Sequence, residues 1–136
     1  MKKLLSAVLA LSLVFALSAC AAKADLGSFD EASITKRAEE VIDIVNTGDY
    51  DAVVLQVRED LRPQLTAKQL SDAWAPALTT AGKFVEFSAS KATSAKDEAS
   101  GEEYATVQVV CKYENGPKTF TISMDKDMAI TGLYMK

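Results

Sequence analysis

Beyond residue 27, the hydrophobic residues first recur at helical spacing. Five of them lie three or four positions apart and form one apolar face: Ile34, Ala38, Val41, Ile42 and Val45. The segment from Ser28 to Glu31 (SFDE) has the composition of a capping box, which predicts that a first helix begins there. Gly48 provides a natural end for that helix, because glycine adopts the left-handed conformation of many helix termini.

Two further helices are predicted before the pattern changes. Asp49 is placed to cap a short second helix through Val57, and Arg62-Pro63 breaks it. A second capping box at 66–69 (TAKQ) opens a third helix, which Ala81-Gly82 ends. Pro76 lies inside this third helix and is expected to kink or interrupt it, since proline has no N–H to donate.

From Lys83 onward, apolar and polar residues alternate with the period of a β-strand. In the first strand Val85 and Phe87 alternate with Glu86. Residues 93–103 (TSAKDEASGEE) are polar and predict an exposed hairpin loop. The clearest strand is 104–113, whose odd-numbered residues are mostly apolar and whose even-numbered residues are mostly polar.

The last two strands are separated from their neighbours by turn residues. Asn115-Gly116 is a strong tight-turn signal, and residues 120–124 form the next alternating segment. Residues 125–127 (DKD) predict another turn before a last strand over 128–135. Helices followed by an antiparallel meander predict an α+β domain, with three N-terminal helices packed on a curved four-stranded antiparallel sheet.

The N-terminus has the organisation of a secretory signal. Lys2 and Lys3 precede an apolar stretch over 4–17, which is shorter than the roughly 20 residues of a membrane-spanning helix. Residues 17–20 (LSAC) resemble the lipobox of bacterial lipoproteins, which implies a diacylglyceryl group on Cys20. The expected division is a signal peptide over 1–19, a lipidated cysteine and short tether over 20–27, and one domain over 28–136. The alternative is an ordinary signal cut near residues 19–22.

Composition narrows the chemistry of the mature domain. The formal net charge of −4 becomes −6 once Lys2 and Lys3 leave with the signal, and no basic cluster suits a nucleic-acid phosphate backbone. The chain has no histidine, which removes the commonest general base and zinc ligand. Cys111 is the other cysteine, expected to be buried and inert; no disulfide forms if Cys20 carries lipid.

Several segments resemble the bacterial domain of unknown function 3887. The most distinctive are residues 48–50 (GDY), 65–87 and 130–134 (ITGLY), and the resemblance covers about residues 33–136. Members occur in lipoproteins, mainly of Gram-positive cell envelopes, and beside α/β-hydrolase domains; the Gly-x-Ser-x-Gly motif of such hydrolases is absent here. The resemblance implies a cone-like fold of the nuclear transport factor 2-like and cystatin-like group, and it carries no function.

That fold implies a pocket between the helices and the concave sheet face. The residues expected to line it are Tyr50, Trp74, Phe84, Phe87, Val107, Val109, Cys111, Phe120 and Ile122. One interpretation is a site for a small apolar or aromatic ligand. The other is that these side chains fill the space themselves, which is the commoner fate of an aromatic stripe.

Catalysis and metal binding fit the sequence less well. Isomerase or hydratase chemistry needs a buried carboxylate with a shifted pKa, whereas Glu86 and Asp125 are expected to face solvent. Asp49, Asp51 and the 125–127 turn suit helix caps and turns better than a calcium site, so no metal or cofactor is expected.

The expected protein is therefore an envelope lipoprotein on the outer face of the cytoplasmic membrane. Its domain is expected to bind a partner protein or a small ligand without catalysis; the alternative is a pocket enzyme of the isomerase or hydratase type. A homodimer through the exposed sheet face is a further expectation, with four residues near the contact: Tyr104, Thr106, Gln108 and Val110.

Overall fold

The computed structural model describes residues 25–136, so the signal segment and Cys20 lie outside the described residues. Four helical segments come first: α2 (Glu31–Asn46), α3 (Tyr50–Gln56), the 3₁₀ helix η2 (Glu59–Gln64) and α4 (Ala67–Ala81). Four strands follow: β1 (Phe84–Lys96), β2 (Glu103–Tyr113), β3 (Gly116–Met124) and β4 (Ile130–Met135). The strands form one antiparallel sheet in the order β1-β2-β3-β4.

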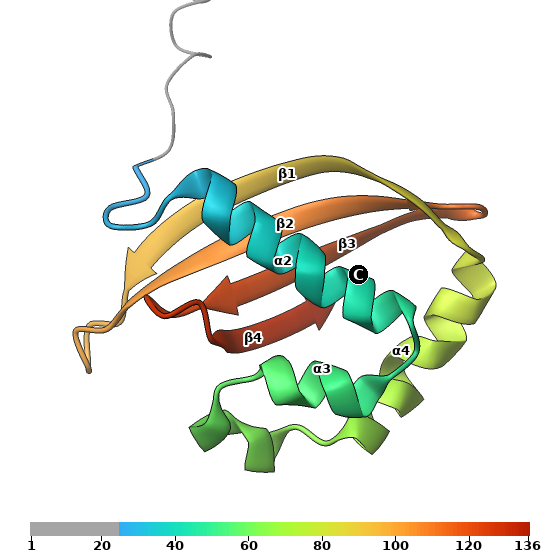
Figure 1. Cartoon of the computed structure of the whole chain (residues 1–136), viewed down its shortest axis with the longest axis horizontal. Helices are drawn as coiled ribbons and strands as arrows, with labels where there is room; N and C mark the ends of the chain where they lie inside the picture. The colour runs from blue at the N-terminus through green and yellow to red at the C-terminus, as the bar shows by residue number, and fades with distance from the viewer. Residues whose placement is uncertain (1–24) are drawn as a thin grey trace, which may run out of the picture.

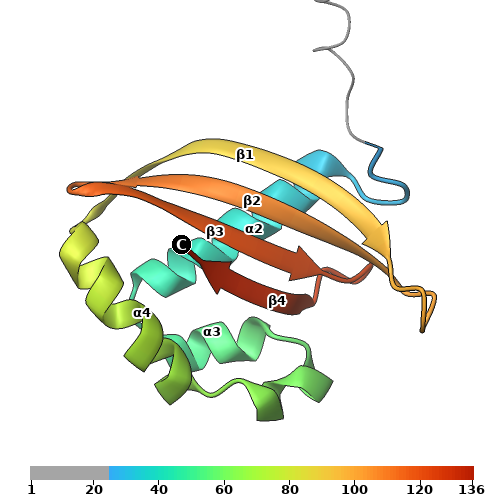
Figure 2. The same ribbon diagram turned by 180° about the vertical axis from the view of Figure 1, so that it is seen from behind.

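The helices are gathered on one side of a curved sheet (Figure 1). Helix α2 lies across that side and packs against β1, β2 and β3. Segments α3 and η2 lie beyond the edge formed by β4, whereas α4 descends from the start of β1 and also contacts β3. The view from behind shows the opposite side of the sheet free of helices (Figure 2). The α+β class and the four-stranded antiparallel sheet are thus confirmed.

The core lies between α2 and the sheet. The predicted apolar face of α2 is buried in full, at 2% exposure or less. From β2 and β3, Val107, Phe120 and Ile122 meet it with no exposed surface. Because burying a Val, Ile or Phe side chain contributes roughly 1.5–3 kcal/mol, this layer holds the helix to the sheet without a disulfide.

The helix starts follow capping chemistry, with one change of position. Helix α2 is capped by Asp30, whose carboxylate accepts from the Ser33 N–H at 3.0 Å, and not by Ser28 as predicted. The Ser28 hydroxyl instead donates to Glu103 on β2 at 2.9 Å. The capping box of Thr66 and Gln69 is confirmed at the start of α4.

The predicted number of three helices is wrong, because a fourth segment forms at the proline. Residues 59–64 make the 3₁₀ helix η2, with Pro63 inside it. The hydrogen bonds from Leu61 N to Arg58 O (2.9 Å) and from Leu65 N to Arg62 O (3.1 Å) skip the proline, whose missing N–H is therefore not needed. Pro76 likewise does not interrupt α4, where the residue is exposed and water can satisfy the freed carbonyl.

Strand β1 differs most from its prediction. It continues to Lys96, so the hairpin loop is shorter than residues 93–103. Register shifts after Phe84 and after Phe87 break the simple alternation, and the two rings lie together with centroids 4.9 Å apart while Val85 is 50% exposed. A bulge adds a residue on one strand only, which moves the following side chains to the other face.

The last strand begins two residues later than predicted. Met128 has a φ of 59°, a left-handed conformation, and belongs to the turn that precedes β4. Its N–H donates to Asp125 O at 3.0 Å, which closes the turn. A residue with positive φ cannot continue a strand, so β4 starts at Ile130.

Candidate functional site

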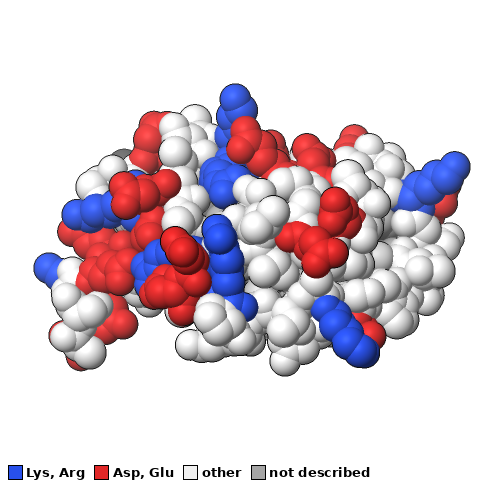
Figure 3. Space-filling view, turned by 60° about the horizontal axis from the view of Figure 1, so that its bottom comes forward, with Lys and Arg blue, Asp and Glu red and all other residues white. Residues whose placement is uncertain are grey.

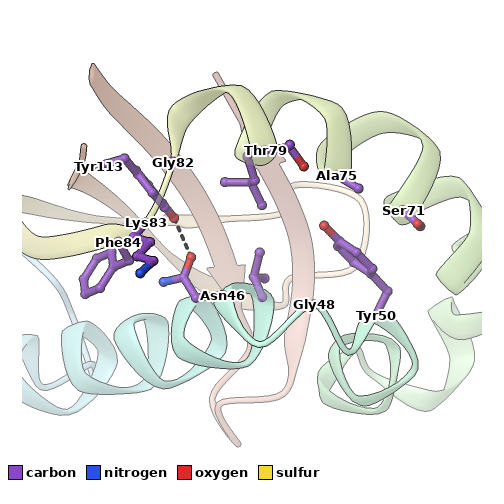
Figure 4. Close-up of a pocket in the computed structure, with 12 residues that line it drawn as sticks. Asn46, Gly48, Tyr50, Ser71, Ala75, Thr79, Gly82, Lys83, Phe84 and Tyr113 are labelled. Atoms are coloured by element: carbon purple, nitrogen blue, oxygen red, sulfur yellow. Dashed lines mark hydrogen bonds between the residues drawn. The ribbon is translucent and has the colours of Figure 1, made fainter. Parts of the chain in front are cut away.

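A cleft of about 630 Å³ opens where the end of α2, the start of α3, α4 and the start of β1 meet (Figure 4). We call it the Asn46 cleft. Its wall is partly apolar and partly polar, and it is lined by Val45, Asn46, Gly48, Tyr50, Ser71, Ala75, Leu78, Thr79, Gly82, Lys83, Phe84 and Tyr113.

Two glycines and one cap position the chain around the cleft. Gly48 has a φ of 79° and turns the chain between α2 and α3, and Asp49 then accepts from the Ala52 N–H at 3.0 Å. This cap places Tyr50 as the first residue of α3, with its hydroxyl pointing into the space toward α4 (Figure 4). On the opposite wall, Gly82 has a φ of 83° and ends α4, so that Lys83 and Phe84 lead into β1.

Asn46 and Tyr113 form the polar contact at the back of the cleft. The Tyr113 hydroxyl donates to Asn46 Oδ1 at 2.6 Å (Figure 4). That distance is typical of an O–H···O bond. Asn46 Nδ2 is left buried, with no hydrogen-bond partner among residues 25–136. A buried donor without a partner costs about 1–3 kcal/mol, so this nitrogen marks a place where a partner is missing.

The tyrosines of the cleft stay protonated at neutral pH. Burial raises the pKa of Tyr50, and burial is also the largest cause of the raised pKa of Tyr113. Both hydroxyls therefore act as neutral hydrogen-bonding groups.

Charge in the cleft comes from Lys83. No Asp or Glu is among the lining residues described, and the nearby Glu114 carboxylate accepts from the Lys83 backbone N–H at 2.9 Å. The wall can bind an acceptor oxygen and an apolar group, and it contains no carboxylate that could act as a base.

The nine residues expected to line a pocket are divided by the structure. Tyr50 and Phe84 line the Asn46 cleft, and Trp74 lines a different groove beside β4. Phe87 is half-buried against Phe84. The remaining five have no exposed surface and lie in the core: Val107, Val109, Cys111, Phe120 and Ile122. Trp74 meets Phe120 edge-on, with ring centroids 5.8 Å apart.

Sequence reasoning missed the polar residues of the cleft. The sequence patterns gave Asn46 no role, and they predicted Tyr113 only as the last residue of an apolar strand face. A usable signal was present, because a polar side chain two residues before Gly48 at the end of an apolar helix, and a tyrosine at the end of a buried strand face, both need hydrogen-bond partners. Their pairing spans 67 residues of sequence and follows only from the tertiary fold.

At the other end of the molecule, charged groups are joined in a network. Arg58 binds Asp60 at 2.7 Å, the Glu102 carboxylate, and Asp125 at 3.4 Å. The expectation that Asp125 faces solvent is wrong: the residue is 8% exposed. Its other carboxylate oxygen accepts from the N–H groups of Asp127 (2.9 Å) and Ala129 (3.0 Å), because the β3–β4 turn folds back over it.

The four residues expected at a dimer contact face the helix-free side of the sheet. Gln108 is exposed, whereas Tyr104, Thr106 and Val110 are half-buried. Among residues 25–136, no group of three or more Cys, Asp or Glu residues is arranged to hold a metal ion. No helix in that same part of the chain is long and apolar enough to cross a membrane.

Comparisons with known proteins identify a family and one solved relative. The model of the family described as protein of unknown function (DUF3887) matches residues 38–133. The structure is similar to the NMR structure of a protein from Ruminococcus gnavus ATCC 29149, with a TM-score of 0.75 and 27% sequence identity. The alignment covers 83% of this chain and 96% of that chain. No curated protein matches the sequence.

Proposed function

The chain belongs to the DUF3887 family of proteins of unknown function, and from that premise we propose that it is a lipid-anchored, non-catalytic domain that binds a small ligand in the Asn46 cleft. The observation that carries the proposal is the Asn46 side chain, whose Nδ2 is buried and unpartnered among residues 25–136. The nitrogen has no surface open to the cleft in this structure, so a ligand oxygen accepts from it after a small shift of the surrounding side chains, which removes the cost of the missing hydrogen bond.

The proposed anchor rests on the N-terminal sequence. The LSAC segment at 17–20 supports lipid on Cys20 and a position on the outer face of the bacterial cytoplasmic membrane. Two acyl chains give stable membrane attachment, at roughly 0.8 kcal/mol for each buried methylene. The Cys20→Ser variant is expected to lose metabolic labelling by a palmitate analogue. Undiminished labelling of this variant would contradict the anchor.

The overall arrangement supports a binding role. Helices on one side of a curved antiparallel sheet, with a cleft at one end between them, agree with a nuclear transport factor 2-like cone, which we infer as the finer description of this fold. The half-buried rings of Tyr50 and Phe84 offer apolar contacts beside the polar back wall. Binding fits this wall better than isomerisation or hydration, because those reactions need a carboxylate that the lining residues do not supply.

The test compares what co-purifies with matched variants. The lipoprotein is extracted from its own membranes with mild detergent and denatured, and the released small molecules are measured by mass spectrometry. Asn46→Leu removes the amide at similar size, whereas Gln108→Leu makes the same kind of change on the exposed outer sheet face. A compound retained by wild type and Gln108→Leu but reduced at least about tenfold in Asn46→Leu supports the proposal, since tenfold corresponds to about 1.4 kcal/mol.

Two results count against the proposal. Equal retention by Asn46→Leu would place the ligand elsewhere. No compound above the level found with an unrelated lipoprotein would argue that the cleft holds only water.

A further inference from the structure

The main chain of β4 has a free edge. The order β1-β2-β3-β4 leaves β4 at the side of the sheet, where it pairs only with β3 along most of its length. Thr119 and Lys136 exchange two backbone hydrogen bonds of 2.9 Å each. Because paired and outward-facing residues alternate in an antiparallel ladder, the N–H and C=O groups of Leu133 and Met135 point away from β3. Among the described residues these groups have no backbone partner.

The chain itself shows that this edge accepts a strand. Val57 forms a single parallel bridge with Ile130, and the Arg58 N–H donates to Ile130 O at 2.8 Å. The chain then turns away into η2. Pairing therefore begins at the first residue of β4 and stops there, which leaves the rest of the edge open.

A continuous groove runs beside the open part of the edge. Two hollows of about 210 and 540 Å³ lie between β4 and the helices η2 and α4, and both are lined by Gln64, Leu65 and Leu133. The wall is largely apolar and includes the half-buried Met135 and the edge of Trp74. β4 has six residues, so the groove accompanies roughly 20 Å of extended chain.

The charge of the groove is opposite to that of the protein. Lys118 lies on the inner face of β3, is half-buried, and forms no ion pair with any residue among 25–136. Lys136 lines the same end of the groove, and no Asp or Glu lines either hollow. In a chain with a net charge of −4, Lys118 is a local cation at the end of an apolar channel, and it favours an anionic group there.

We propose that an extended segment of another protein adds to the free edge of β4 as a fifth strand, with apolar side chains in the groove and an acidic group against Lys118. The unpaired main-chain groups favour a peptide over an anionic amphiphile, because only a peptide has N–H and C=O groups at the spacing of a strand. A second copy of this chain fits poorly, because the open edge lies in a groove of about 210 and 540 Å³ whose opposite wall is formed by η2 and α4, and such a groove suits a single extended chain better than a second sheet.

The test uses fluorescein-labelled peptides and the full mature protein in detergent micelles. The probe is Glu-Thr-Val-Thr-Val-Thr-Glu, in which the two Val and the two Glu side chains share one face of a strand, so that with Val in the groove either strand direction brings a carboxylate toward Lys118. One control peptide replaces both Glu with Lys. A second keeps every side chain but has alternate backbone nitrogens methylated, which blocks strand pairing on one edge. Binding is followed by fluorescence anisotropy, and the Leu133 and Met135 amides by NMR.

The expected result is saturable binding of the probe below about 1 mM, with shifts of the Leu133 and Met135 amides and at least about tenfold weaker binding of both control peptides. Lys118→Glu should also weaken the probe about tenfold, whereas Lys91→Glu, on the exposed far strand β1, should leave it unchanged. The proposal is overturned if no peptide binds, if the methylated peptide binds equally well, or if decanoate displaces the probe and binds more tightly.

Discussion

The two ends of the molecule treat their polar groups in opposite ways. At the end that carries η2 and the β3–β4 turn, charged side chains are crowded together (Figure 3), and Arg58 joins three carboxylates there. At the end that carries the Asn46 cleft, the polar groups are fewer, and the Asn46 amide nitrogen is buried without a partner among residues 25–136. At the first end the polar groups bind one another and hold separate segments of the chain together. At the second end a buried donor lacks a partner, as is typical of a binding site.

The difference distinguishes polar side chains that stabilise the fold from polar side chains that are suited to bind a ligand. The carboxylate of Asp125 satisfies an arginine and two backbone N–H groups, so each bond holds the turn in place. Asn46 satisfies Tyr113 through its oxygen and nothing through its nitrogen. Protein interiors seldom leave donors unpaired, and violations of that rule concentrate at functional sites. Five experiments test this contrast, beginning with the largest expected effect.

The first concerns the core that separates the two ends. Cys111 has no exposed surface, and burial, aided by the charges of Glu39 and Asp43, raises its pKa to about 12. We expect its reaction with a thiol reagent at pH 8 to be at least about 1000-fold slower in the folded protein than in urea, since the thiol must await opening of the core. Gln108→Cys, on the exposed outer sheet face, provides the accessible control. Rapid labelling of Cys111 would mean that the cleft reaches into the core.

The second experiment removes a carboxylate from the charged network around Arg58. Asp125→Ala is expected to lower the free energy of unfolding by about 2–3 kcal/mol, because two turn N–H groups lose their acceptor and Arg58 Nη1 keeps only Glu102. Asp127→Ala removes an exposed carboxylate from the same turn and should change the free energy of unfolding by less than about 0.5 kcal/mol. Urea denaturation at pH 7 measures both. Equal effects would show that the network does not stabilise the turn.

The third compares two glycines on the rim of the cleft. Gly82→Ala places a Cβ 2.8 Å from a Glu114 carboxylate oxygen and 3.0 Å from the Glu114 Cβ, at a φ of 83°. Gly48→Ala has a similar φ of 79° but meets no atom within 4 Å. We expect losses of about 2 and about 1 kcal/mol in unfolding free energy, since Gly82 has a φ of 83° with a ψ of −156°, a region almost restricted to glycine, and Gly82→Ala also adds a clash. A larger loss for Gly48→Ala would contradict this explanation.

The fourth experiment lowers the pH, which protonates carboxylates at the charged end and is expected to destabilise the fold. The Arg58 side chain lowers the pKa of Asp60, and the Ser28 hydroxyl, followed by Lys126, lowers that of Glu103. A carboxyl whose folded pKa is depressed stabilises the fold above its unfolded pKa, and this contribution is lost as the pH falls. Thermal midpoints should therefore fall as the pH drops through about 4.5 and below. The thermal midpoint should fall less steeply with pH in Arg58→Met than in wild type. An identical pH dependence of the two midpoints would mean that Arg58 does not cause the decrease.

The fifth expects almost no effect on stability. The double variant Asn46→Leu/Tyr113→Phe removes both partners of the hydrogen bond and the unpaired amide nitrogen together. Replacing both partners with apolar groups is often close to neutral, so we expect the unfolding free energy to change by less than about 1 kcal/mol while ligand retention is lost. A loss of 3 kcal/mol or more in urea denaturation would show that the pair is structural, like the network at the other end.

Local patterns in the sequence predicted most of the elements and their faces. The helical face from Ile34 to Val45 is buried as expected, and the alternation in β2 is confirmed along the strand. Predictions failed where a neighbour in space overrode the local pattern. The bulges of β1 bring Phe84 and Phe87 to one side, and Asp125 is buried because Arg58 approaches from a segment 67 residues away.

The predicted site residues show the same division. Apolar residues on strand faces were correctly expected to point inward, but periodicity cannot distinguish a filled core from the wall of a cleft. Val107 and Phe120 lie where packing leaves no space, whereas Tyr50 and Phe84 line the cleft between the helices and the start of β1. Whether an inward-facing side chain meets another side chain or solvent depends on the distance between layers, which sequence spacing does not encode.

The sequence by itself determined the α+β order, the apolar faces, the absence of histidine and the lipobox-like segment before the domain. These features follow from residue type and spacing along the chain, which are local properties. Only the tertiary structure decided that Asn46 would meet Tyr113 and lose a partner for its nitrogen, that Arg58 would bury Asp125, and that η2 and α4 would leave the edge of β4 uncovered. Each of these depends on groups far apart in sequence, whose meeting is fixed by the packing of the whole domain.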